Sequence, residues 1–271
     1  MATVQVNSWA DFVQAVAVTG DTVICPENAV WDMNEIAPEG VPGLQILSAE
    51  VRGNGTEIRN LRVASSINLG GGGDFYQSID ALHFVNFIGE SGPFFAAAGT
   101  QRMGARTDLT GCKFSGLLPQ NAQFFCEVGG YYHDTRPTHF SQCAFTIEFG
   151  YNNPWYATQI TRNGTIKLCR MHIQLPNGAL FYPNASWSYV RIDCPGMVNL
   201  NVNDMAATVY DGDLPQLTGV IGAAAATYPS VFNKDTMPQF PGAANVIGVT
   251  EAQLRDPEYL RSIGFPIGVE V

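Results

Sequence analysis

The feature that most constrains the fold of this sequence is a short apolar pattern that recurs along the chain. Each copy begins with an apolar residue and continues with apolar and polar residues in alternation, most often with a cysteine or valine three positions on. The copies are LHFVNF (82–87), LTGCKF (109–114), FSQCAF (140–145) and LCRMHI (168–173), the last with Met171 in the cysteine position, and shorter matches open at Leu61 and Val190. Alternation with a period of two predicts strands. Recurrence at intervals of roughly 20 to 30 residues predicts a repeat fold.

A repeat of this length is enough for two or three short strands joined by turns, which is one turn of a β-solenoid. Turn-forming residues fall between the strand segments, at 53–55, 70–73, 129–130 and 163–164. Like side chains of successive turns should lie over one another, so Cys112 and Cys143 should occupy equivalent inward positions. We therefore predict an all-β fold, a right-handed parallel β-helix (β-solenoid) with a short N-terminal capping helix and an extended C-terminal tail.

A single amphipathic helix is predicted over residues 7–20. Ser8 can cap it, Asp11 falls in its first turn and Gly20 ends it. Its apolar residues have helical spacing and form one face: Trp9, Phe12, Val13 and Val16. The strand-like segment DTVICP (21–26) follows directly, so we expect Trp9 and Phe12 to serve in capping the open end of the strand stack.

The chain divides into two regions in this prediction. Residues 1–205 form the β-helix with its helical cap, and residues 206–271, where the alternation fades, form an extended tail with a short helix. Thr250 and Gln253 make a capping box for this helix. The apolar residues near its end must bury against the rod, a neighbouring subunit or another protein: Leu260, Ile263, Phe265 and Ile267. The tail is thus either a second cap or an assembly arm.

One stretch carries a family resemblance. RGNGTEIRNLRV (52–63) and the entry of a small amphipathic helix into DTVIC (21–25) resemble the early turns of the pectate-lyase-like parallel β-helix superfamily. That superfamily includes polysaccharide lyases, bacterial surface proteins and phage tail spikes. The resemblance covers residues 8–205 and concerns architecture more than chemistry.

Charge and motifs disfavour several functions. The net charge is −10 without a basic run, and phosphate contacts need clustered positive charge, so nucleic acid is not an expected partner. No apolar run reaches the roughly 18 residues of a membrane span, and no export signal is visible. We therefore expect synthesis in a host cytoplasm and no membrane partner. The six cysteines form no C-x-x-C pair, which predicts buried free thiols instead of zinc ligands. Without a nucleotide fingerprint, no cofactor is expected.

The resemblance also implies where chemistry would be sought. Lyases of the superfamily use calcium-binding carboxylates with a basic residue, and its hydrolases use paired or clustered aspartates. The candidates are Asp211 with Asp213, and Asp134 beside His133 and Arg136. We interpret the first pair as an acidic turn and the second group as a solvated loop, and assign no catalytic or metal-binding residue. Three histidines alternate with apolar residues and should point outward from strands: His83, His139 and His172.

Aromatic residues in turns are the stronger functional signal, because the apolar face of a sugar stacks on a flat ring. The glycan-binding candidates are Tyr131, Tyr132, Trp155, Tyr156, Trp187 and Tyr189. Packing over loops or against a partner subunit is the alternative interpretation of these rings.

These observations favour a non-enzymatic structural protein of a phage virion, such as a tail, fibre or capsid-surface component, with glycan binding as an added hypothesis. Its partners would be other virion proteins, further copies of the chain and a host-surface glycan, and its location would be the virion. The alternative is a polysaccharide lyase or glycoside hydrolase on the same scaffold. A bacterial surface adhesin is a third, weaker hypothesis.

Overall fold

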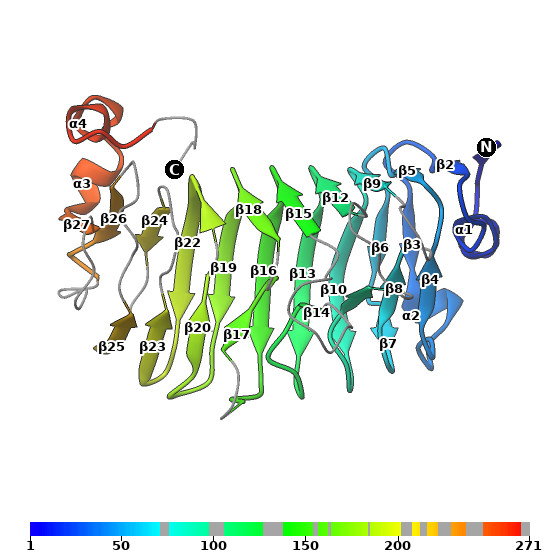
Figure 1. The fold of residues 1–271 in the computed structure, drawn as a ribbon. Helices are drawn as coiled ribbons and strands as arrows, with labels where there is room; N and C mark the ends of the chain where they lie inside the picture. The colour runs from blue at the N-terminus through cyan, green and yellow to red at the C-terminus, as the bar shows by residue number, and fades with distance from the viewer. Residues whose placement is uncertain are drawn as a thin grey trace.

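The computed structural model describes residues 1–70, 76–97, 106–126, 138–153, 157–161, 164–183, 185–201, 208–211, 216–221, 229–236 and 246–266. Within these residues the fold is predominantly β, and the strands pair in parallel. The strands stand in a row from one end of an elongated molecule to the other (Figure 1). No helix in this part of the chain is long and apolar enough to cross a membrane.

Four sheets contain the strands. Sheet 1 runs in spatial order through β1 (Thr3–Gln5), β2 (Thr22–Ile24), β5 (Glu50–Arg52), β9 (Tyr76–Asp80), β12 (Arg106–Thr110), β15 (Thr138–Ser141), β18 (Thr165–Lys167) and β21 (Ala185–Ser186). Sheet 2 runs through β3 (Val30–Asp32), β6 (Glu57–Arg59), β10 (His83–Gly89), β13 (Lys113–Leu118), β16 (Ala144–Phe149), β19 (Arg170–Gln174), β22 (Ser188–Asp193), β24 (Thr208–Asp211), β26 (Ser230–Asn233) and β27 (Val246–Val249), with β7 (Arg62–Val63) beside β10. Sheet 3 holds β4 (Leu44–Ile46), β8 (Ile67–Leu69), β11 (Phe95–Ala97) and β14 (Phe125–Cys126), and sheet 4 holds β17 (Thr158–Gln159), β20 (Leu180–Tyr182), β23 (Met197–Asn201) and β25 (Gln216–Ile221).

Between β2 and β23 the chain visits the sheets in a fixed rotation. After β9 in sheet 1 it enters sheet 2 as β10 and sheet 3 as β11, and then returns to sheet 1 as β12, beside β9. We call one such passage a circuit. A bridge between Gln123 and Gln159 joins sheets 3 and 4 into a common third side. Equivalent residues of successive circuits therefore lie side by side, about 4.8 Å apart.

The corner between sheets 1 and 2 is built alike in successive circuits. One residue there adopts the left-handed backbone conformation, with φ between 48° and 63°: Ala81, Gly111, Gln142, Leu168 and Trp187. Its N–H donates to the next circuit, as from Gly111 to the Ser141 carbonyl at 3.0 Å. Most side chains avoid this conformation, so the hydrogen-bonded sheets on both sides must hold it in place.

Aromatic side chains fill the interior. Phe84, Phe114 and Phe145 are in register on β10, β13 and β16, and all are buried. The Phe84 and Phe114 ring centroids lie 6.1 Å apart, and those of Phe114 and Phe145 lie 5.2 Å apart, with both pairs stacked. Such pairs contribute about 0.5–1.5 kcal/mol each beyond the burial of their area.

A ladder of cysteines runs beside the phenylalanines. Cys112, Cys143 and Cys169 are buried free thiols at equivalent inward positions of three successive circuits. The Cys143 N–H donates to the Cys169 Sγ at 3.4 Å. The prediction that Cys112 and Cys143 stack is confirmed.

Two details of the predicted repeat are wrong. Met171 pairs with Phe145, so it does not take the cysteine position. Val85 pairs with Ser115, so it does not take that position either. The Met171 error is a shift of two residues, which keeps the same side chains inward and leaves the alternation unchanged. The Val85 error is a shift of three residues, because the buried Leu82 takes the position equivalent to Cys112.

The predicted N-terminal helix is confirmed as α1 (Trp9–Val16), which ends before Gly20. The Ser8 hydroxyl accepts the Asp11 N–H at 3.2 Å. Trp9 and Phe12 are buried against Trp31, with centroid distances of 6.2 and 5.3 Å. The helix lies at the N-terminal end of the row of strands (Figure 1), and a second short helix, α2 (Met33–Ile36), follows β3.

Strands continue beyond residue 205. β24, β26 and β27 extend sheet 2, and β25 extends sheet 4. The prediction of an extended tail without paired strands is therefore wrong. These strands are short and lie between segments rich in Ala, Pro and Gly, so the alternation is interrupted before it becomes recognisable. The division into domains at residue 205 stays a prediction.

Two helices pack on the outer face of sheet 2 at its C-terminal end, α3 (Glu251–Leu254) and α4 (Pro257–Ser262). Tyr189 is in register with Val209 and Val231, on the face opposite to the inward Val190. A second hydrophobic cluster, which we call the C-terminal cluster, covers this face: Val209, Val231, Val249, Leu254, Leu260 and Phe265, with Trp187, Tyr189, Ile247, Tyr259 and Ile263 packed against it.

The predicted capping box is confirmed, because Thr250 and Gln253 exchange both hydrogen bonds. The single short helix that was predicted here is instead two helices, separated at Arg255 and Asp256. Leu260, Ile263 and Phe265 bury against the chain's own sheet, while Ile267 lies outside the described residues.

Candidate functional site

The outer face of sheet 2 is hollowed beside the C-terminal cluster. Two adjoining hollows, of about 400 and 550 Å³, share Glu148 and Gln174 in their walls. We call them together the outer groove. Its polar lining consists of Asn86, Ser115, Thr146, Glu148, His172, Gln174 and Asp193.

A bulge at one end of the groove bends the sheet. The register between β10 and β13 shifts between Val85 and Phe87, and Asn86 between them has a left-handed backbone, φ 56°. The Asn86 N–H leaves the ladder and donates to the Ser115 Oγ at 3.1 Å. A Cβ on Gly116 would lie 2.3 Å from the Phe87 carbonyl oxygen, so this bend needs glycine there. Bulges re-aim strands in this way, often beside functional sites.

Two columns of outward side chains form the floor of the groove. Thr146 and His172 are in register on β16 and β19, and the column continues beyond the lining of the groove as Arg191 on β22. Glu148, Gln174 and Asp193 form the second column, two residues further along the same strands. The Glu148 and Asp193 positions are therefore two strand spacings apart, about 10 Å.

The two carboxylates of the second column differ in their partners. Asp193 is paired on both oxygens, with His172 Nε2 on Oδ2 and with Arg191 Nε on Oδ1 at 3.3 Å. Glu148 is exposed, and no side chain among the described residues pairs with its carboxylate. The groove thus combines one fixed carboxylate, one open carboxylate, two amides, an imidazole and hydroxyl groups. This set suits a ligand rich in hydroxyl groups.

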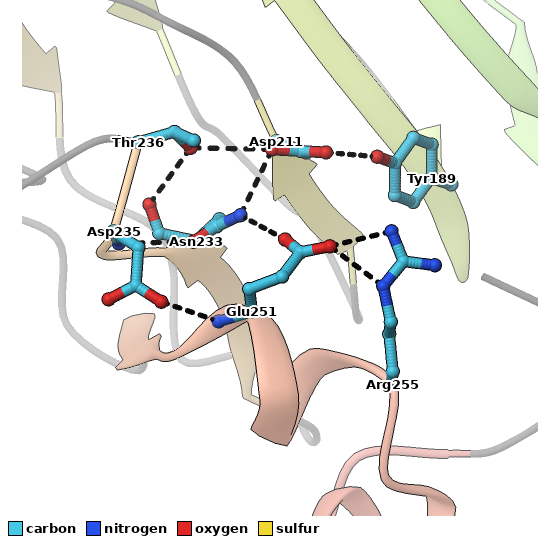
Figure 2. A network of polar contacts seen from close by, with 7 residues as sticks. All are labelled: Tyr189, Asp211, Asn233, Asp235, Thr236, Glu251 and Arg255. Atoms are coloured by element: carbon cyan, nitrogen blue, oxygen red, sulfur yellow. Dashed lines mark hydrogen bonds and ion pairs between the residues drawn. The ribbon is translucent and has the colours of Figure 1, made fainter.

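Beyond Arg191 the outer face is covered by α3. Figure 2 shows the polar network at this boundary, in which Asp211 accepts from the Tyr189 hydroxyl, from Asn233 Nδ2 at 3.1 Å and from Thr236 Oγ1 at 3.3 Å. Burial raises the pKa of Tyr189 well above its usual range, and the hydrogen bond to Asp211 is a smaller cause in the same direction. The network fixes the last strands of sheet 2 together.

The same network ties α3 to those strands. The Asn233 amide also donates to Glu251 Oε2 at 2.7 Å, and Arg255 Nε donates to Glu251 Oε1 at 2.7 Å (Figure 2). The Glu251 N–H donates to Asp235 Oδ2 at 2.8 Å. These bonds therefore hold the two helices against the last strands of sheet 2.

Of the predicted acidic pair, Asp211 and Asp213, the second lies outside the described residues. Asp211 is buried in the network of Figure 2 and does not face the outer groove. His133, Asp134 and Arg136 also lie outside the described residues.

The histidines differ from one another. His172 lines the groove and is exposed, as predicted. His139 is partly buried, with Nδ1 2.7 Å from Thr165 Oγ1, and burial lowers its pKa. His83 is adjacent on β10 to the inward Phe84 and is only 8% exposed, and its Nδ1 accepts the Lys113 N–H on the neighbouring strand at 3.2 Å.

Four of the six aromatic candidates lie outside the described residues: Tyr131, Tyr132, Trp155 and Tyr156. Trp187 and Tyr189 are half-buried against the C-terminal cluster, and the Lys167 ammonium lies 4.3 Å from the centre of the Trp187 ring. Their role in glycan binding stays a prediction. Tyr151, 42% exposed directly after the groove residue Gly150, is an open aromatic ring that the sequence did not single out.

Glu148 and Asp193 were also missed from the sequence. Each lies at an outward position next to inward apolar residues, so its polarity alone looks like an ordinary solvated strand residue. Only the register of β16, β19 and β22 brings them to one surface. The repeat in the sequence could have found them had it been aligned on the cysteine ladder.

No family model, curated protein or solved structure matches this chain. Among the described residues no group of three or more His, Cys, Asp or Glu side chains could hold a metal ion. The case for a function therefore depends on the geometry of the outer groove.

Proposed function

We propose that the four parallel sheets are the sides of one right-handed parallel β-helix of the pectate-lyase-like kind. The fixed rotation of the chain through the sheets supports this proposal, as do the cysteine and phenylalanine columns inside. The left-handed residue repeated at one corner also supports it, because a repeated corner is what a winding chain requires.

We further propose that the chain is a non-enzymatic structural component of a phage virion that contacts a host-surface glycan through the outer groove. The observation that carries the glycan proposal is the floor of that groove. Its outward amide, hydroxyl and carboxylate groups repeat along one direction at about 4.8 Å, so they can bond successive hydroxyl groups of an extended saccharide. The virion assignment follows from the family resemblance and from the elongated shape (Figure 1).

Glycan binding is tested by filling the groove. Thr146 is an exposed strand residue on its floor, and Thr165 is an exposed strand residue on the outer face of sheet 1. We expect Thr146→Trp to abolish binding on a glycan array and Thr165→Trp to leave it unchanged. Equal binding by both variants, each with an unchanged circular dichroism spectrum, would exclude the groove. The virion assignment is tested by immunogold labelling of particles released from cells that encode the protein.

A glycoside hydrolase is the second candidate, and the placement of Glu148 and Asp193 favours it. Inverting glycosidases hold two carboxyl groups roughly 6.5–9.5 Å apart, and the two strand spacings here, about 10 Å between backbone positions, bring the side chains near that range. Release of reducing ends from a bound glycan, lost in Glu148→Gln, would establish this candidate over the non-enzymatic one.

A further inference from the structure

We infer that the outer groove selects neutral or amino-bearing saccharides and rejects uronate-rich chains, an inference that rests on the proposed function. Its basis is the ionisable groups that line the groove. Among the described residues these are two carboxylates, Glu148 and Asp193, one histidine, His172, and the buried Cys194 thiol, with no lysine or arginine in the lining.

One cation beside the groove, Arg191, is already paired with a carboxylate. The Arg191 guanidinium is next to His172 in the register, and its Nε donates to Asp193 Oδ1 at 3.3 Å. A uronate carboxylate that approached the Arg191 guanidinium would compete for it with Asp193, which lies two residues further along β22. The pairing with Asp193 offsets the positive charge that Arg191 would present to a second anion.

Glu148 dominates the electrostatics of the shared wall. It lines both hollows, it is exposed, and no described side chain neutralises it. A hydroxyl group of a neutral sugar can donate to this carboxylate, and the ammonium of an amino sugar can form an ion pair with it. A uronate at the same place would face a like charge, and the chain's net charge of −10 adds long-range repulsion.

The experiment measures binding of three matched oligosaccharides to the full chain by isothermal titration calorimetry at low and moderate salt. The probes are a glucosamine oligomer, a maltose-series oligomer and an oligogalacturonate of equal length. We expect the first two to bind and the uronate to bind at least about tenfold more weakly, with the difference reduced by salt.

Two variants with the same change in charge separate the local effect from the global one. Glu148→Gln should weaken glucosamine binding relative to maltose binding by about tenfold and should improve uronate binding. Glu35→Gln, at an exposed position on α2 away from the groove, should change neither ratio.

The outcomes distinguish the two levels of the proposal. Failure of all three probes to bind removes the glycan-binding function and this inference with it. Binding of the uronate as tightly as maltose, or unchanged ratios in Glu148→Gln, overturns the charge selection alone.

Discussion

Replacing Phe114 by alanine tests the packing of the phenylalanine column, Phe84, Phe114 and Phe145, at its central member. Phe114 is 1% exposed and lies in register between Phe84 and Phe145. Its ring centroid lies between 5.1 and 6.1 Å from the centroids of five others: Phe84, Phe95, Phe124, Phe140 and Phe145.

The expected cost follows from burial and from the inability of the site to collapse. A buried Phe→Ala change costs about 3–5 kcal/mol through lost transfer energy and the cavity left behind. Phe114 belongs to a strand hydrogen-bonded on both sides, to β10 and β16, so its neighbours cannot move into the space. We therefore expect a loss near the top of the range, about 4–5 kcal/mol in the free energy of unfolding.

Urea unfolding followed by far-ultraviolet circular dichroism measures this loss. With a slope of about 3 kcal/mol per molar urea, the midpoint should fall by about 1.5 M. Lys113→Ala, an exposed neighbour on the same strand, should change stability by no more than about 0.5 kcal/mol. A loss below about 1 kcal/mol for Phe114→Ala would mean that the phenylalanine column is not a tightly packed core, and the reasoning would fail.

Two further predictions concern buried polar groups. Burial raises the pKa of Cys25 from 9.0 to about 12, so between these values the folded chain keeps a proton that the unfolded chain releases. Stability should therefore fall as pH rises from about 9 towards 12. Cys25→Ala should flatten this part of the curve of unfolding free energy against pH, measured by urea titration. Asn233→Ala removes the fully buried amide that donates to both Asp211 and Glu251. This should lower the free energy of unfolding by about 3 kcal/mol and should speed amide hydrogen exchange in α3 and α4 much more than in β13. Equal exchange rates in the two regions would contradict the role of the network in holding the helices.

Local signals in the sequence were sufficient for α1, for the start of α3 and for the inward positions of Cys112 and Cys143, but not for α2 or for the break between α3 and α4. The Ser8 cap and the apolar spacing of Trp9 and Phe12 predicted α1, and the Thr250 and Gln253 pair predicted the start of α3. These signals depend on hydrogen bonds within a few residues of one another, so neighbouring sequence contains all the required information. Period-two alternation likewise predicted that Cys112 and Cys143 would face the interior.

Register, by contrast, depends on contacts between strands of different circuits. Alternation is unchanged by a shift of two residues, so the sequence could not decide between Met171 and Cys169 as the partner position of Cys143. The strands beyond residue 205 are short and separated, and pairing with β22 is what orders them. The C-terminal helices were visible as helices, but their place on the outer face of sheet 2 was not.

The outer groove is a product of tertiary structure. Glu148 and Asp193 are far apart in sequence and come together because β16, β19 and β22 lie side by side. The bulge at Asn86 and the close approach at Gly116 then shape the hollow. The sequence by itself determined the inward positions of Cys112 and Cys143 and the starts of α1 and α3, because those signals are local. The alignment of separate circuits, and with it the groove, was decided only when the sheets packed.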